Sequence, residues 1–171
     1  MKNLFILFAG FAFAACNNSP APVETTTTPA PAVEEQHDHS AMAAMDTTAI
    51  APGQKVFFPN LKDGQEIKLP FIVKFGVEGM EVEPAMGVVA NKGHHHLIVD
   101  QSFIPASTMV PMQKEAEGYF HFGKGQLSDT LNLKKYPMLT PGKHTLTLQF
   151  ANGLHMSYGA AMSHKVTIVV K

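Results

Sequence analysis

Residues 144–150 and 164–170 alternate apolar and polar side chains with a period of two, and this alternation is the strongest constraint on the fold. Successive side chains of a β-strand point to opposite faces, so such a period predicts strands that are apolar on one face. The dipeptide Pro141-Gly142 precedes the first run and is typical of a turn. The chain therefore ends in two predicted strands.

Further short apolar runs are separated by turn residues such as Asp63-Gly64. Pro70 interrupts two of them and favours a sheet edge or a crossover at that point. No helical stripe of useful length competes, although residues 112–117 can form one helical turn. The pattern predicts an all-β fold, an immunoglobulin-like antiparallel β-sandwich of about seven strands. The remaining predicted strands lie at residues 55–58, 66–69, 71–77, 95–100 and 127–133.

The first fifteen residues carry one Lys and then an unbroken apolar and small-residue run that ends at Cys16. This run is too short for a lasting transmembrane helix and has the flanks of a signal peptide. Small residues directly before a cysteine favour lipidation, in which Cys16 becomes the new N-terminus and carries acyl chains that anchor it to a membrane. We expect a lipoprotein signal peptide at 1–15 and a location on the periplasmic or cell-surface side of a bacterial membrane. An ordinary secretory signal with a chance cysteine is the alternative.

Residues 16–53 are rich in Pro, Thr, Ala and acidic side chains and contain no aromatic residue. Such a composition predicts a disordered, solvated tether that links the anchored Cys16 to a domain at 54–171. His37 and His39 lie in the tether, and two methionines follow them. Imidazole and thioether groups are good copper ligands, so these histidines are alternate metal ligands, although a polar linker with chance histidines fits the same residues.

Charge and cysteine content exclude several classes of protein. The chain has no Arg, no dense Lys patch and a formal net charge of −1, so a nucleic-acid partner is not expected. With Cys16 as the single cysteine, neither an internal disulfide nor a thiolate zinc site can form. The motifs of serine hydrolases, zinc proteases and phosphate-binding loops are also missing, so we expect no enzymatic activity.

Seven of the nine histidines lie in the predicted domain. His94 and His96 share one face of a predicted strand and can supply two imidazoles to one ion, whereas His95 points away. His121 lies between two phenylalanines, and His155 lies in the loop before the last strand. A hydrogen-bonded network that supports loops is the alternative for these four histidines. His144 and His164 begin strands and are expected to be structural.

We interpret His94, His96, His121 and His155 as candidate metal ligands, with Met156, His95 and Met86 as alternates. Neutral imidazoles with a thioether suit a transition metal, copper above all, with zinc second. The sequence therefore predicts a non-enzymatic metal-binding domain. An envelope adhesion or scaffolding module that binds a protein or glycan partner, with structural histidines, is the alternative function.

Several runs of residues also resemble a known bacterial family. They are FGVEGM at 75–80, GHHHLIVD at 93–100, HFGKGQ at 121–126 and PGKHTL at 141–146, followed by His155. Together they resemble the family catalogued as domain of unknown function 4399, and the resemblance covers about residues 55–171. It implies a small exported domain and no established activity. Where members often carry Pro-His and Pro-Pro after this last histidine, the chain has Ser157-Tyr158 and Ala160-Ala161.

Overall fold

The computed structural model describes residues 48–171. The predicted signal peptide, Cys16, His37 and His39 therefore lie outside the described residues. Within the described part of the chain, no helix is long and apolar enough to cross a membrane.

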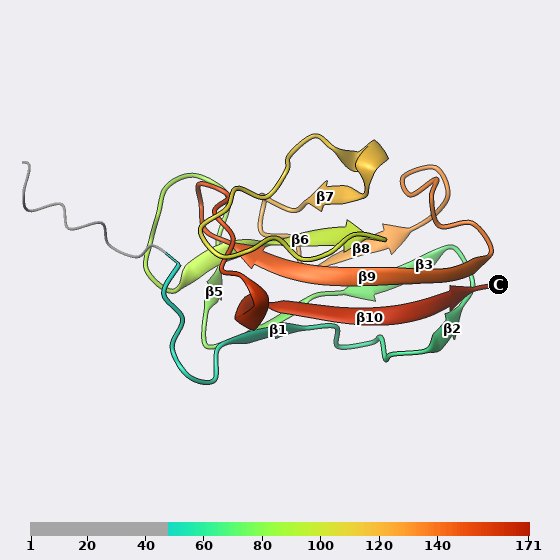
Figure 1. Ribbon diagram of the computed structural model, residues 1–171, viewed down its shortest axis with the longest axis horizontal. Helices are drawn as coiled ribbons and strands as arrows, with labels where there is room; N and C mark the ends of the chain where they lie inside the picture. Colours follow the sequence, from blue (N-terminus) through green and yellow to red (C-terminus); the bar gives the residue numbers. More distant parts are fainter. Residues whose placement is uncertain (1–47) are drawn as a thin grey trace, which may run out of the picture. The chain divides into compact units, whose positions relative to one another are not determined.

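A six-stranded sheet forms the larger part of the domain (Figure 1). Its strands follow the order β2, β10, β9, β6, and both β5 and β7 pair with β6. The paired strands β9 and β10 run side by side along the domain and fulfil the two-strand prediction from the period-two alternation. The strands are β2 (Gln65–Ile67), β5 (Glu81–Val82), β6 (Lys92–Val99), β7 (Tyr119–His121), β9 (Gly142–Ala151) and β10 (Ser163–Val170).

Two short ladders complete the fold, and they pack on one face of the large sheet. One pairs β1 with β4 and the other pairs β3 with β8. The core cluster joins them to the sheet, because it contains Val56 of β1, Val73 of β3 and Leu131 of β8 together with Leu148 and Ile168. The ladder strands are β1 (Lys55–Phe57), β3 (Phe71–Lys74), β4 (Gly76–Glu78) and β8 (Ser128–Leu131); the short 3-10 helices are η2 (Glu115–Glu117) and η3 (Ala160–Met162).

The all-β prediction is confirmed, but the strand count and directions differ in detail. The described residues form ten strands, because several are only two to four residues long and the predicted strand at 71–77 is divided at Phe75. Most pairs are antiparallel, as predicted, whereas β2 runs parallel to β10 and β5 runs parallel to β6. The immunoglobulin-like class stays a prediction.

The second face of β6 and β9 is also covered. The segment after β6 passes in front of this face in Figure 1, and its Ile104 donates its backbone N–H to Gln149 at 2.7 Å and accepts from the Gln149 amide at 2.7 Å. Gln149 and Thr147, which form the polar side of the alternation, are therefore buried. Ile98 and Val110 add apolar contacts to this second layer, in which the histidine cluster lies.

Residues 48–53, which the sequence places in the tether, also contact the domain. Thr48 is buried and its hydroxyl lies 2.8 Å from the Ser107 hydroxyl. Ile50 packs against the core, and the Gln54 side chain binds the backbone of Ala51 and Gly79. The contacts of the domain therefore begin no later than Thr48.

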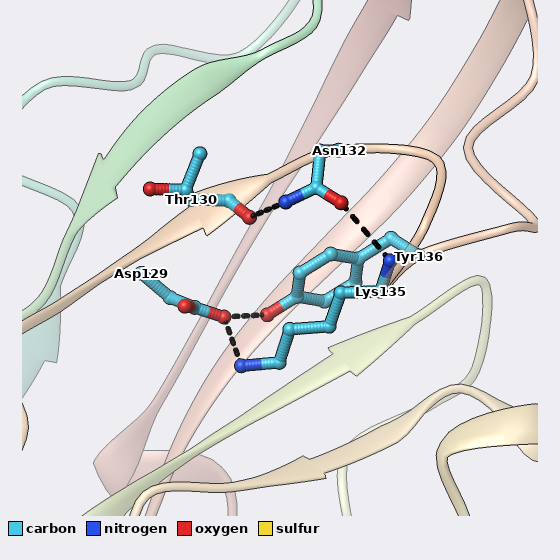
Figure 2. Close-up of polar contacts among 5 residues, drawn as sticks. All are labelled: Asp129, Thr130, Asn132, Lys135 and Tyr136. Atoms are coloured by element: carbon cyan, nitrogen blue, oxygen red, sulfur yellow. Dashed lines mark hydrogen bonds and ion pairs between the residues drawn. The ribbon is translucent and has the colours of Figure 1, made fainter.

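A group of polar contacts links the end of β8 to the loop before β9 (Figure 2), and its Tyr136 packs on Phe120 of β7. The Tyr136 hydroxyl donates to the Asp129 carboxylate, which also pairs with Lys135, and Asn132 accepts from the Lys135 backbone. Burial and the neighbouring Asp129 raise the pKa of Tyr136 strongly, so the phenol stays protonated and remains a donor. Its ring packs on Phe120 with 4.1 Å between centroids, which fixes the strand that carries His121.

We expect Tyr136→Phe to lower the free energy of unfolding by about 1.5–3 kcal/mol, because it removes a buried hydrogen bond to a charged acceptor. Tyr158→Phe is the matched control: it removes a hydrogen bond to the neutral Lys92 carbonyl, worth about 0.5–1.5 kcal/mol. Denaturant unfolding followed by circular dichroism measures both. An equal or smaller loss for Tyr136→Phe would contradict the role assigned to these polar contacts.

Candidate metal centre

The three consecutive histidines of β6 are divided between its two faces, as the period-two alternation predicts. His94 and His96 point into the second layer, and their Nε2 atoms lie 3.1 Å apart. His95 points into the main core, where its ring contacts Phe75 and Phe150 at centroid distances of 5.5 and 5.0 Å. All three are 1% exposed or less. The pair formed by His94 and His96 therefore lies inside the domain, on the face of β6 opposite to His95.

His121 reaches the cluster through strand pairing. The register of β6 and β7 places His121 directly opposite His96, and paired residues of neighbouring strands project from the same face. Phe120 and Phe122 point the other way and are buried, each 2% exposed. The sequence Phe-His-Phe thus anchors β7 in the core through its aromatic side chains and directs the imidazole between them toward His94 and His96.

His155 is supplied by the tight hairpin that follows β9. The Asn152 backbone accepts from His155 N–H at 2.8 Å, and its own N–H donates to Met156 at 3.0 Å, which closes a three-residue loop. Such loops require a left-handed residue, usually glycine, at their last position. His155 occupies it with a φ of 65°. A side chain other than glycine at this position indicates a role beyond turn formation.

The four imidazoles face one another. Nε2 of His155 lies 3.1 Å from Nε2 of His121, which repeats the spacing of His94 and His96. Ring centroids within the cluster are separated by 4.8 to 5.9 Å. The ligand atoms of His94, His121 and His155 all lie within 4.8 Å of one another and can hold a metal ion. Two nitrogens bound to one tetrahedral ion lie about 3.3 Å apart, so small shifts suffice.

The surroundings keep these imidazoles neutral. Burial, followed by repulsion from the other histidines, lowers the pKa of His94 to about 3 and that of His96 well below its ordinary value. The pKa values of His121 and His155 are lowered mainly by burial as well. A neutral imidazole has a free lone pair for a metal ion, whereas imidazolium does not. The cluster is therefore in its metal-binding protonation state at neutral pH.

Two buried ring nitrogens of the cluster, Nδ1 of His94 and Nδ1 of His96, have no hydrogen-bond partner among the described residues. In a hydrogen bond between the two Nε2 atoms, one neutral imidazole donates and the other accepts. The accepting ring then carries its own proton on Nδ1, which is buried and unpaired. Such a group costs about 1–3 kcal/mol. Binding of both Nε2 lone pairs to an ion would place a proton on each Nδ1, so these unpaired nitrogens do not by themselves argue for an ion.

The other predicted residues lie outside the cluster. His95 is excluded as a ligand because it occupies the opposite face of β6, and burial lowers its pKa to about 4. Met86 is 83% exposed. Met156 directly follows His155 and pairs with Met109 through its backbone, so it stays an alternate ligand. His144 and His164 are structural, as expected: His144 bonds the Asp100 carboxylate and the Thr140 carbonyl, and His164 accepts from the Phe58 backbone.

Sequence reasoning missed Met112, which lines the cavity beside His121 and His155. It lies in the irregular segment between β6 and β7, where no strand periodicity gives its direction. The backbone bond from Val110 to the His155 carbonyl, 2.8 Å long, brings this segment to the histidines. Only a long-range contact of this kind places Met112, and the sequence carries no signal for it.

We expect His155→Asn to leave the stability of the metal-free protein within about 0.5 kcal/mol of wild type. Asparagine tolerates the left-handed conformation as well as histidine does, and the side chain is partly exposed. Metal affinity should fall at least tenfold with the loss of an imidazole. Thermal melts with a chelator and metal titrations measure the two effects. His155→Val is the matched control, because a β-branched residue disfavours positive φ and should destabilise the hairpin. Equal metal affinity in His155→Asn would remove His155 from the site.

The family comparison agrees with the resemblance seen in the sequence. Residues 73–171 match the model of the family described as domain of unknown function 4399. The match covers more than half of the chain, so the protein belongs to this family. It begins at Val73, after β1 and β2, and includes all four clustered histidines. Neither the curated proteins nor the solved structures include a match.

Proposed function

We propose that the domain binds a transition-metal ion, copper in particular, at His94, His96, His121 and His155, and that it does so without catalysing a reaction. The observation that carries this proposal is the convergence of the ligand nitrogens of His94, His121 and His155, brought together from β6, β7 and the hairpin after β9. Three separate elements direct their imidazoles at one another. Buried phenylalanines hold β7 in place, and the left-handed turn at His155 orients the hairpin.

The chemistry of the donor set favours copper. The group of ligand atoms contains imidazole nitrogens and no carboxylate, which makes it unsuited to Mg²⁺ or Ca²⁺. Imidazole sites bind divalent copper more tightly than the other divalent first-row metals, zinc included. Zinc is the second candidate, because it accepts the same ligands in tetrahedral geometry.

The proposal extends to the setting of the domain. The apolar run before Cys16 supports a lipoprotein signal peptide and a lipid anchor on the outer side of a bacterial membrane. On this account, the protein holds a metal ion in the cell envelope, close to the membrane surface. His37 and His39 of the proposed tether offer an additional, weaker pair of ligands.

The adhesion or scaffolding alternative predicts a different geometry for the histidines. If they only supported loops, their nitrogens would bind backbone carbonyls and point apart, as His144 does toward Thr140. The four clustered histidines instead make side-chain contacts with one another. This arrangement favours the metal-binding proposal over the alternative.

Calorimetric titration of the untagged protein with Cu(II) and Zn(II), and competition titration with Cu(I), test the proposal. The titrated protein is the variant with His37→Asn and His39→Asn, so that the proposed tether contributes no imidazole. We expect one ion per chain at micromolar or tighter affinity, with copper preferred over zinc. Dissociation constants no tighter than about millimolar, roughly −4 kcal/mol, for all three ions would refute it.

A further inference from the structure

The cluster reaches solvent through its two partly exposed histidines, His121 and His155. His94 and His96 are buried, while His121 and His155 line a cavity of about 550 Å³. Met112, Glu115, Lys124 and Gln126 form other parts of its wall. Met112 therefore shares the wall of this cavity with two of the clustered imidazoles.

The position of Met112 is fixed by its neighbours. Val110, two residues earlier, is fully buried and donates its N–H to the His155 carbonyl. Gln113, the next residue, has a φ of 55°, so the chain turns sharply there and the 3-10 helix η2 follows. Met112 is thus held between an anchored residue and a turn, at the wall that carries His121 and His155.

Met112 is also exposed for a large apolar side chain, at 40%. Methionine normally fills gaps in a core, whereas this side chain leaves a large part of its surface exposed at the cavity. Its thioether sulfur is a soft, uncharged donor, which prefers Cu(I) to Cu(II) or Zn(II).

The charge of the site also favours Cu(I). The clustered imidazoles are neutral, and the cavity wall carries one carboxylate, Glu115, and one ammonium group, Lys124, so it contributes no net charge to neutralise an ion. The cost of burying an unneutralised charge rises steeply with that charge. A monovalent ion therefore fits the cluster better than a divalent one.

We infer that Met112 supplies a thioether ligand beside His121 and His155, and that this makes the site selective for Cu(I). This inference rests on the proposed copper function and adds the oxidation state and a fifth candidate ligand. The resident ion is held by the imidazoles, and the sulfur binds from the cavity side.

Met112→Leu tests the inference, with Met109→Leu as the matched control. Both are exposed methionines of the same segment, but only Met112 lines the cavity. Leucine keeps the volume and removes the sulfur. Cu(I) affinity is measured without oxygen in competition with bicinchoninate, Cu(II) affinity by calorimetry, and sulfur ligation by X-ray absorption of the Cu(I)-loaded protein. Circular dichroism verifies that each variant is folded.

We expect Met112→Leu to weaken Cu(I) binding at least tenfold, to change Cu(II) binding less than twofold and to remove the sulfur signal. Met109→Leu should change none of these. Unchanged Cu(I) affinity in Met112→Leu, or equal losses in both variants, would overturn the inference while leaving copper binding intact. Failure of the wild-type protein to bind copper or zinc in any form would instead overturn the proposed function.

Discussion

At pH 5 the metal-free protein should be roughly 4 kcal/mol less stable than at pH 8 from His94 and His95 alone, and His96 should add to this loss. Each is buried with a lowered pKa, about 3 for His94, about 4 for His95 and well below the ordinary value for His96. An unfolded histidine titrates near pH 6.5, so below that pH the unfolded chain binds protons that the folded domain does not. Stability is therefore complete above about pH 7 and falls as the pH falls, by roughly 2 kcal/mol at pH 5 for each of His94 and His95.

Such a loss is comparable with the whole stability of a small domain, about 5–15 kcal/mol, so acid unfolding should be evident in equilibrium denaturation. His95→Leu isolates one histidine, because it removes the titrating group from the core and retains an apolar side chain. Its stability relative to wild type should rise by roughly 2 kcal/mol between pH 8 and pH 5. Phe75→Leu is the control: Phe75 contacts His95 but does not titrate, so its effect should be the same at both pH values. A parallel pH dependence in wild type and His95→Leu would contradict the assignment.

A metal ion should stabilise the protein by about 2.7 kcal/mol when its free concentration is 100 times the dissociation constant. For a domain of this size, the melting temperature at pH 7.5 should then rise by several degrees. The double variant His121→Gln and His155→Asn should lose the metal-dependent shift. These two side chains are partly exposed, whereas removal of His94 and His96 would also open the buried second layer.

The double variant His144→Gln and His164→Gln is the control for general histidine loss. Its two histidines lie outside the cluster and bind Asp100, Thr140 and the Phe58 backbone. Its melting temperature without metal should fall, because those bonds are lost, while the metal-dependent shift should persist. A shift that vanishes in this control, or that survives in the cluster variant, would place the ion elsewhere.

Much of the fold follows from local pattern. The alternation at 144–150 and 164–170 predicts β9 and β10, and the same period separates His95 from His94 and His96. What local pattern could not give was the covering of the second face. The chain at 103–110 has no periodicity, yet Ile104 bonds the buried Gln149 and Val110 bonds the His155 carbonyl. The strand alternation gives the direction of His94 and His96 but not their burial.

The sequence predicts His121 and His155 as ligands of the same ion as His94 and His96, but it does not show how they come close to β6. The register of β6 with β7 places His121 opposite His96, and register depends on pairing between residues 25 positions apart in the chain. His155 depends on a left-handed turn residue, which sequence patterns rarely reveal outside glycine and asparagine. The position of Met112 depends on the backbone bonds that join residues 107–110 to His155 and Ser157. Each of these is a long-range relation that only the folded chain defines.

The most direct test of the central claim is the X-ray absorption spectrum of the copper-loaded, untagged protein with His37→Asn and His39→Asn. The spectrum reports how many imidazole rings bind the ion, because the outer ring atoms scatter in a recognisable pattern. We predict at least three imidazole ligands per copper, reduced by the variant His121→Gln and His155→Asn. A copper environment of oxygen ligands without imidazole, or one that this variant leaves unchanged, would contradict the account.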